Sequence, residues 1–345
     1  MFSYDNQVVR EDMERLSALD FKPFRGRRVL VTGVTGMLAT YLACAFLYMN
    51  DKCGLGVGLT GLARHREKAE MRFGALLERP DFTLLTQDVT EPLTAGPFDV
   101  IFHLAGSASA RAIASAPVDV ITANVLGTKN VLEAAARRPG TKVFFASTRE
   151  VYGRSEETVL REETLGTLDM LLPRSCYPES KRMAENLCAV YHQEFGVPVC
   201  IARIAHSYGP GMQLAGDGRV MADLLGNASR GEDIVLHSDG SARRAFCYLT
   251  DTVAGILTAF THTEGWGVFN IANETEEISV RELAELAAGC VPGGHVTYAA
   301  PPADSARAYF NVPRVRLSTE KLEALGWRPQ VKLREGVART LKSLL

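Results

Sequence analysis

Residues 28–42 read RVLVTGVTGMLATYL, which is an apolar strand, a tight turn and a helix that follows without a break. Gly33 allows a turn that a Cβ would obstruct, and Gly36 lets backbone N–H groups approach an anion closely. The small side chain of Ala39 lets the helix pack close to the strand. A pyrophosphate bound at this turn would lie at the positive end of the helix dipole. The stretch predicts the first crossover of a dinucleotide-binding fold, and the other interpretation of it is an ordinary strand–turn–helix connection.

Composition places the chain among ordinary globular proteins. It has 345 residues, of which 46% are hydrophobic and 23% charged, enough for one large two-lobed unit or two domains. The net charge is −2 and no basic block occurs, so we expect no nucleic-acid partner. Seven scattered cysteines without a C-x-x-C pair fit a reduced protein. Because no apolar run reaches the ~18 residues of a membrane span, we expect a cytoplasmic protein without a membrane partner.

Strands and helices alternate after the glycine turn. The patterns predict strands within 54–63 and at 82–86, 99–104 and 142–147, and helices at 37–49, 66–78 and 117–137. Such alternation requires right-handed crossovers onto one parallel sheet. The expected fold class is therefore α/β: a Rossmann-type doubly wound parallel sheet with a smaller mixed α/β C-terminal substrate lobe. Residues 6–19 have apolar side chains at helical spacing, which predicts a short helix that caps one edge of the domain or exchanges between subunits.

The residues after each strand bear on the cofactor. An NAD-binding fold normally ends its second strand with Asp or Glu for the ribose 2′-hydroxyl, and this chain has neither there. Arg64 would neutralise a 2′-phosphate, which indicates NADP, or it is a solvated start of the next helix. Asp88 follows the third strand, where its carboxylate would meet the adenine edge. Ala105 and Gly106 leave room for the cofactor, whereas Asn124, within an apolar helical face, fits a structural hydrogen bond better than a cofactor contact.

Two motifs carry the candidate chemistry. The strand 142–147 runs into Thr148 and Glu150 at its carboxyl end, where ligands of a parallel sheet bind. Tyr177 and Lys181 lie one helical turn apart on the same face. An ammonium beside a phenol favours phenolate, so we expect Lys181 to lower the pKa of Tyr177 and allow it to accept a proton near neutral pH. Alone such a pair has little weight, but after a nucleotide-binding turn it indicates a catalytic pair.

With these motifs the chain resembles the extended short-chain dehydrogenase/reductases, the NAD-dependent epimerase/dehydratase family, over about residues 27–335. The resemblance rests on the segments GVTGMLA, HLAG, NVLGTKN, STREVYG, YPESK, RIAHSYGP, FNIAN and LGWRP. Within the family the chain is most similar to UDP-glucuronate decarboxylases (UDP-xylose synthases), through ASTREVYG, the PRSCY that ends at Tyr177, DGRV and RRAFCYLTD. Arg149 and His206 depart from that subfamily, which has a small polar residue and Asn at these positions.

The resemblance implies a role for each candidate site residue. Tyr177 would take the proton of a sugar 4-hydroxyl while hydride passes to a tightly bound and recycled NAD or NADP. Lys181 would bind the nicotinamide ribose, Thr148 would hydrogen-bond the 4-oxygen, and Glu150 matches the family's active-site glutamate. The implied cofactor-binding residues are Gly33, Thr35, Gly36, Met37, Leu38, Arg64, Asp88, Val89, Leu104, Ala105, Gly106, Asn124, Ala146 and Lys181. The implied substrate-binding residues are Ser107, Arg149, His206, Arg219 and Arg244. We expect no metal, because the histidines are dispersed and have no ligand spacing.

The implied reaction removes the carboxylate of a UDP-hexuronic acid. Oxidation at C4 places a ketone β to the C6 carboxylate, carbon dioxide leaves as an enolate forms, and the same cofactor returns its hydride. Nucleotide-sugar 4,6-dehydratases share the Thr-x-Glu arrangement, and C4 or C5 epimerases use the same ketone, so both stay open as alternatives. A catalytically silent NAD(P)-binding regulatory protein is the alternative of another class. Arg149 has three open roles: it grips a substrate carboxylate, pairs with Glu150, or points away.

The expected organisation has three parts. Residues 1–25 form an N-terminal helical extension, and residues 26–207 form the dinucleotide-binding Rossmann lobe, to which 243–273 returns. Residues 208–345 form the sugar-nucleotide-binding lobe. The resemblance also implies a homodimer built on the helices that follow residues 117 and 177, with a nucleotide sugar as the small-molecule partner.

Overall fold

A seven-stranded parallel sheet forms the centre of the molecule, in the order β12-β7-β5-β4-β1-β2-β3. The computed structural model describes residues 6–299 and 315–344, so small parts of the expected extension and of the expected C-terminal lobe lie outside the described residues. In the parallel register, Val31 of β1 lies opposite Gly61 of β2 and Phe102 of β4. This arrangement confirms the predicted Rossmann-type doubly wound fold. The strands are β1 (Arg28–Thr32), β2 (Gly58–Ala63), β3 (Phe82–Thr86), β4 (Val100–His103), β5 (Lys142–Thr148), β7 (Val199–Ile204) and β12 (Trp266–Ile271).

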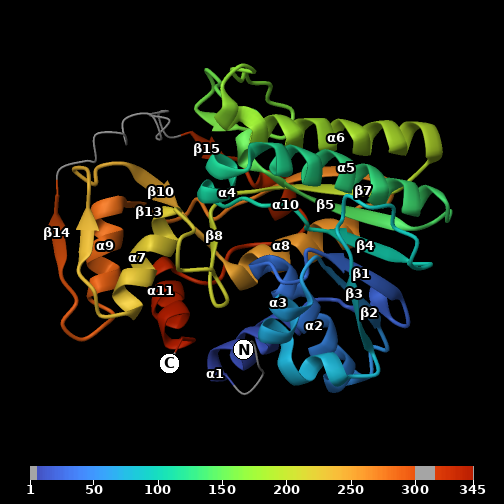
Figure 1. Cartoon of the computed structure of the whole chain (residues 1–345), viewed down its shortest axis with the longest axis horizontal. Coiled ribbons are helices and arrows are strands. Elements are labelled where there is room, and N and C mark those ends of the chain that lie inside the picture. The colour runs from blue at the N-terminus through green and yellow to red at the C-terminus, as the bar shows by residue number, and fades with distance from the viewer. Residues whose placement is uncertain (1–5, 300–314, 345) are drawn as a thin grey trace.

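Helices cover both faces of the sheet (Figure 1). One face carries α5 (Pro117–Ala136) and α6 (Cys176–Phe195), and the other carries α2 (Met37–Cys53), α3 (Arg66–Phe73) and α8 (Leu249–His262). Alternate strand residues supply the two cores, because successive side chains of a strand point to opposite faces. Val31 and Phe102 belong to the core under α2 and α8, whereas Leu30 and Ile101 belong to the core under α5 and α6. Burial on both faces explains why these strands read as continuous apolar runs.

A smaller lobe stands beside the sheet, on the left of Figure 1. It contains α7 (Val220–Ser229), α9 (Val280–Ala288), α11 (Leu333–Lys342) and the strand pairs β9 (Ile234–Leu236) with β14 (Val296–Tyr298) and β10 (Arg243–Ala245) with β13 (Glu277–Ser279). Leu225, Leu283 and Val337 are fully buried in a core of its own. The other elements are α1 (Gln7–Leu16), α4 (Ala110–Ser115), α10 (Glu320–Glu323), β6 (Val159–Leu160), β8 (Ser207–Tyr208), β11 (Cys247–Tyr248), β15 (Arg316–Leu317) and the 3₁₀ turns Lys22–Phe24, Gly74–Glu78, Arg149–Tyr152 and Pro173–Ser175.

Two predicted helix ends differ from the structure, and a glycine decides each. The helix expected at 37–49 continues to Cys53 and ends where Gly54 adopts a left-handed conformation with φ +58°. The helix expected at 66–78 ends at Phe73, because Gly74 has φ +51° and starts a 3₁₀ turn. Nothing in the apolar spacing distinguishes such a turn from a continued helix.

The predicted N-terminal helix is α1, and it packs against α2 and α8. Asn6 caps it by accepting hydrogen bonds from the N–H groups of Val8 and Val9, and Met13 lies in the main core. The helix therefore closes one edge of the sheet lobe. Among the residues that the structure describes, no helix has the length and apolarity needed to cross a membrane.

Candidate active site

A cleft of about 880 Å³ opens where the carboxyl ends of the strands meet the smaller lobe. The glycine turn, the ends of β4 and β5, the start of α6 and the strand β10 all contribute to its wall. The structure thus brings together residues that are far apart in the sequence. The predicted site residues that line the cleft are Thr35, Gly36, Met37, Leu38, Leu104, Gly106, Ser107, Ala146, Thr148, Arg149, Glu150, Tyr177, Lys181, His206, Arg219 and Arg244.

The glycine turn requires a residue without a side chain. Gly33 has φ +66°, and a Cβ there would lie 2.7 Å from the Cα of Ala105. The Thr32 hydroxyl accepts hydrogen bonds from the N–H groups of Leu104 and Ala105, at 3.2 and 3.1 Å, so the ends of β1 and β4 are tied together. Gly36 caps α2, whose first N–H groups have no partner within the helix. These N–H groups suit an anion.

Tyr177 and Lys181 are buried at the start of α6, and both line the cleft. The Lys181 Nζ donates to the carbonyl oxygen of Ala146 at 2.8 Å and lies 4.7 Å from the centre of the Phe145 ring. The hydroxyl groups of Tyr177 and Thr148 share a hydrogen bond. The end of β5 therefore fixes both side chains of the predicted catalytic pair.

The pKa of Tyr177 differs from the expectation. Burial first, and then the charge of Glu150, raise the pKa of Tyr177 to about 12, although the Thr148 hydrogen bond and two arginines act to lower it. Burial also lowers the pKa of Lys181 to about 8. The prediction that Lys181 lowers the pKa of Tyr177 is therefore wrong for the protein chain on its own. Helical spacing places the two side chains on one face, but it says nothing of their desolvation, which is the largest effect here.

Arg174 is a cleft residue to which the sequence analysis assigned no role. Its Nη2 lies 2.9 and 3.2 Å from the two carboxylate oxygens of Glu150, so the pair forms a salt bridge in the cleft wall. Arg149 donates from its Nη2 to the carbonyl oxygen of Val315 at 3.4 Å. The available signal was the PRSCY segment, in which the arginine precedes Tyr177 by three residues.

His206 occupies an unusual backbone position. It has φ +47°, a left-handed conformation that Asn tolerates better than most residues. His206 lines the cleft, so its imidazole is one of the groups that face a ligand there. The ring lies 5.8 Å from the ring of Phe246.

Six of the predicted cofactor residues lie outside the cleft wall: Gly33, Arg64, Asp88, Val89, Ala105 and Asn124. Arg64 has a side chain that is 62% exposed, and its Nη1 lies 3.7 Å from a carboxylate oxygen of Asp88. Val89 lies against Gly127: a Cβ added to Gly127 would be 2.9 Å from the Cγ1 of Val89. Asn124 is fully buried and donates to the Ser180 hydroxyl at 2.9 Å, as expected of a structural amide.

The cleft carries more positive than negative side chains. Its cations are Arg72, Arg149, Arg154, Arg174, Lys181, Arg219, Arg243 and Arg244, and its carboxylates are Glu150, Asp169, Asp217 and Glu274. Glu150 is paired with Arg174, and Asp217 with Arg219, whose Nη2 lies 3.0 Å from a carboxylate oxygen. A cleft of this charge attracts anionic ligands such as diphosphates. Across the described ranges 6–299 and 315–344, no group of three or more His, Cys, Asp or Glu residues could hold a metal ion.

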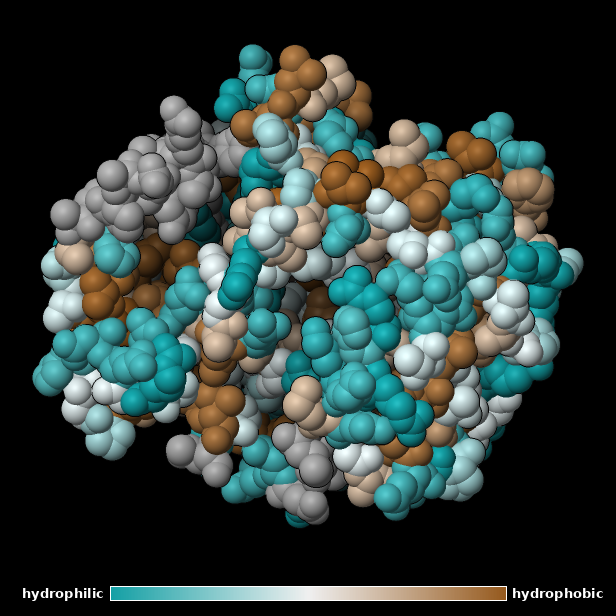
Figure 2. Space-filling view, in the orientation of Figure 1, coloured by the Kyte–Doolittle hydropathy of each residue, from teal (hydrophilic) through white to brown (hydrophobic). Residues whose placement is uncertain are grey.

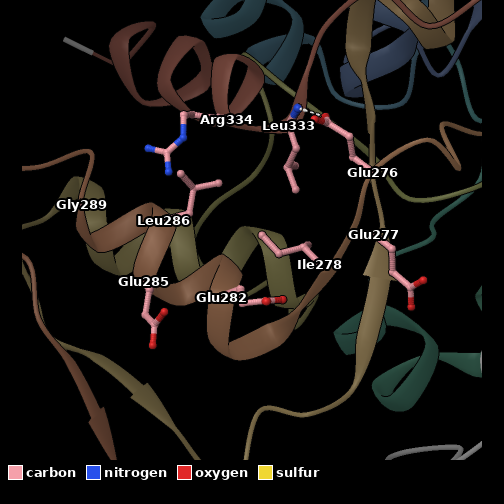
Figure 3. A pocket seen from close by; sticks show the side chains of 9 residues that line it. All are labelled: Glu276, Glu277, Ile278, Glu282, Glu285, Leu286, Gly289, Leu333 and Arg334. Carbon is pink, nitrogen blue, oxygen red and sulfur yellow. Dashed lines mark hydrogen bonds between the residues drawn. The ribbon is translucent and has the colours of Figure 1, made fainter.

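A second hollow, of about 610 Å³, lies in the smaller lobe (Figure 3). Four glutamates line it, but three have other partners: Glu276 accepts from the N–H of Leu333 at 2.5 Å, Glu282 caps α9, and Glu277 pairs with Arg243. None of the predicted catalytic residues lines this hollow. These carboxylates mainly hold helix ends and strands in place.

Comparisons with known proteins give consistent results. Residues 29–272 match the model of the NAD dependent epimerase/dehydratase family. The chain is 36% identical to the UDP-glucuronic acid decarboxylase 6 of Arabidopsis thaliana over 314 residues, which are 90% of this chain and 86% of that protein. Among solved structures, it is similar to the UDP-glucose 4-epimerase of Thermotoga maritima with UDP-glucose, at a TM-score of 0.77, 22% identity and coverage of 92% and 98%. It is also similar to the UDP-glucuronic acid 4-epimerase of Bacillus cereus in complex with UDP-glucuronic acid and NAD, at a TM-score of 0.74, 21% identity and the same coverage. Both structural likenesses concern the fold.

Proposed function

The chain belongs to the NAD-dependent epimerase/dehydratase family, as its motifs predicted, and on this premise we propose that it decarboxylates a UDP-hexuronic acid through a 4-keto intermediate. The observation that carries the proposal is the buried set of Tyr177, Thr148 and Lys181, which faces the same cleft as the glycine turn. A binding module would have no physical need for a buried phenol and ammonium at this position. The relatives named UDP-glucuronic acid decarboxylase favour the carboxylated sugar.

The cleft fits a dinucleotide. The approach of Gly33 to Ala105 leaves a cradle that a Cβ would fill, and the unpaired N–H groups of α2 suit a diphosphate. When bound, NAD or NADP accepts a hydride from the sugar and returns it. Thr35, Gly36 and Met37 would hold the diphosphate, and Lys181 would hold the nicotinamide ribose.

The side chains at the end of β5 would handle the sugar. Tyr177 would take the proton of the 4-hydroxyl, and Thr148 would hydrogen-bond the same oxygen. Loss of that proton and of a hydride from C4 gives the ketone. The electron pair of the C5–C6 bond then forms an enolate as carbon dioxide leaves, and C5 is protonated before hydride returns to C4. Arg174 and Arg219, which lower the pKa of Tyr177, would favour the phenolate form that accepts this proton.

Arginines of the cleft would bind the anionic parts of the substrate. Arg149 and Arg174 flank Glu150 and would hold the carboxylate that departs. Arg219 and Arg244 would hold the sugar diphosphate. The residues 208–345 would then form the sugar-nucleotide lobe, residues 26–207 with 243–273 the dinucleotide lobe, and residues 1–25 an extension of it.

Epimerisation at C4 or C5 and 4,6-dehydration are the competing reactions of the same site. Expulsion of a 6-hydroxyl requires an acid, and Arg149, between Thr148 and Glu150, does not give up its proton readily. We therefore place decarboxylation first. The test is incubation with UDP-, GDP-, dTDP-, CDP- and ADP-sugars followed by mass spectrometry. Loss of carbon dioxide supports the proposal; loss of water, or unchanged mass with altered stereochemistry, assigns one of the competing reactions instead.

Tyr177→Phe tests the proton acceptor. We expect it to abolish turnover and the transient absorbance of reduced nicotinamide, while the thermal unfolding temperature stays within a few degrees of wild type. Tyr191→Phe, the same change on a part of α6 away from the cleft, is the matched control and should retain activity. Turnover by Tyr177→Phe at the wild-type rate would contradict the assignment.

An apolar surface on α5 and α6 supports a homodimer. Figure 2 shows brown side chains along the upper edge of the molecule, where Figure 1 places the two helices. The exposed apolar residues of the helices are Val118, Ile121, Leu126, Met183, Val190 and Phe195. Ile121→Asp should produce monomers in analytical ultracentrifugation, whereas Met71→Asp, on exposed α3, should not.

Seven cysteines without a disulfide fit the cytoplasm.

A further inference from the structure

Arg72 is a cation of the cleft that the proposed reaction does not use. It lies on the last turn of α3, and its Nε donates to the carbonyl oxygen of Thr35, in the glycine turn, at 3.2 Å. Both residues line the cleft. Arg72 is therefore at the end of the cleft where the glycine turn would receive a dinucleotide.

No carboxylate of the residues that the structure describes compensates the charge of Arg72. Within residues 6–299 and 315–344 it takes part in no salt bridge, and one of its five N–H groups serves Thr35. Burial lowers the pKa of Arg72, which reflects the cost of desolvating the guanidinium. A partly buried cation without a counter-charge is costly to the folded protein. An anionic ligand at this position would remove the cost.

The residues that follow the neighbouring strand β2 are compatible with a bound phosphate. β2 ends at Ala63, and the next three residues are Arg64, His65 and Arg66, so no carboxylate is present to bind the ribose 2′-hydroxyl. A carboxylate at this place would also repel a 2′-phosphate. Asp88 follows β3, and one of its carboxylate oxygens lies 3.7 Å from the Nη1 of Arg64.

We propose that Arg72 binds the 2′-phosphate of NADP(H), so that this enzyme uses NADP(H) in preference to NAD(H). The inference rests on the dinucleotide site of the proposed function and adds its specificity. Arg64, which the sequence suggested for this role, is exposed and engaged with Asp88, whereas Arg72 is partly buried at the glycine turn. If Arg72 instead bound the diphosphate, which NAD and NADP share, it would favour neither cofactor.

Binding of two small probes separates these possibilities without any sugar nucleotide. Adenosine 2′,5′-diphosphate carries the 2′-phosphate, and ADP carries only the diphosphate. By isothermal titration calorimetry we expect wild type to bind the 2′,5′-diphosphate at least about tenfold more tightly than ADP, because only the former offers a 2′-phosphate for charge-assisted hydrogen bonds. Arg72→Met should abolish most of this preference and change the affinity for ADP less than about threefold. Arg64→Gln is the matched control and should keep most of the preference.

Each other result overturns the inference. Equal affinity of wild type for the two probes means that no 2′-phosphate site exists, whether or not the variants fold. An equal loss of both affinities in Arg72→Met, with thermal unfolding unchanged, assigns Arg72 to the diphosphate. If Arg72→Met does not fold, Arg72→Lys replaces it, and it should weaken the 2′,5′-diphosphate selectively because a single ammonium replaces the planar fork. Binding of the probes does not depend on turnover. The binding result therefore stands even if the decarboxylation assay fails, and the decarboxylation result stands even if the probes show no preference.

Discussion

Replacing Asp12 with alanine tests how the N-terminal helix is held to the sheet lobe. The Asp12 carboxylate is fully buried and accepts hydrogen bonds from the hydroxyl groups of Tyr41 and Tyr248, both at 2.8 Å. It also accepts from the Nη2 of Arg339 at 2.7 Å. One carboxylate therefore joins α1, α2, α11 and the residue before α8.

The expected loss follows from the partners that alanine would leave behind. Removing one partner of a buried ion pair costs about 3–5 kcal/mol. Arg339 keeps a salt bridge to Glu11 at 2.7 Å and a hydrogen bond to the Val8 carbonyl at 3.1 Å, so we expect the lower end, about 3 kcal/mol. With an unfolding entropy of about 2.1 cal/mol/K per residue, the unfolding temperature would fall by about 4 °C if the chain unfolds as one unit.

Two variants separate the charge from its partners. Burial raises the pKa of Asp12, so its ionised form is itself costly and most of the loss should come from donors left without an acceptor. Asp12→Asn still accepts from the tyrosines and should lose about half as much free energy of unfolding. Glu11→Gln removes a carboxylate that is 43% exposed and should cost at most about 1 kcal/mol.

Urea and thermal unfolding at pH 7, followed by circular dichroism, measure these differences. In the double variant Asp12→Ala, Arg339→Met, the second change should cost less than it does alone, because the partners are coupled. The reasoning is refuted if Asp12→Ala lies within 1 kcal/mol of wild type, or if the two single effects simply add.

Three further predictions concern the site and its support. Glu185 lies one helical turn beyond Lys181, and its carboxylate accepts a hydrogen bond from the Nη2 of Arg203 at 2.7 Å. Glu185→Gln should therefore lower kcat about tenfold with little change in KM. Both constants are measured on the substrate found in the sugar panel. Burial lowers the pKa of Lys181 to about 8, so between about pH 8 and pH 10.5 the unfolded lysine binds a proton that the folded one has lost. The free energy of unfolding of wild type should therefore rise over this range. Lys181→Met should lose this rise, measured by urea unfolding, and should also lose all turnover. Burial alone would raise the pKa of Asp99, but hydrogen bonds and the Arg138 salt bridge hold it below its ordinary value, so its stabilisation is present at neutral pH and lost on acidification. Asp99→Asn should therefore have a lower urea midpoint than wild type at pH 7, and the difference should shrink as the pH falls below 3.8, the ordinary pKa of an aspartate.

The sequence was sufficient for the features that depend on neighbouring residues. The glycine turn is one of them, because the positive φ of Gly33 and its lack of a Cβ are properties of a single residue. The parallel sheet is another, since apolar runs alternating with helical patterns admit few other arrangements. The same holds for the placement of Thr148 and Tyr177 at strand and helix ends, which the structure brings to one cleft.

Only the tertiary structure decided which charged side chains lie in contact and how far each one is buried from water. The salt bridge from Arg174 to Glu150 and the contact of Arg72 with Thr35 join residues 24 and 37 positions apart, and no periodicity encodes either. The raised pKa of Tyr177 likewise follows from burial among several elements. Turn geometry and side-chain periodicity are local and can be read along the chain, whereas desolvation and ion pairing depend on the distances that packing sets.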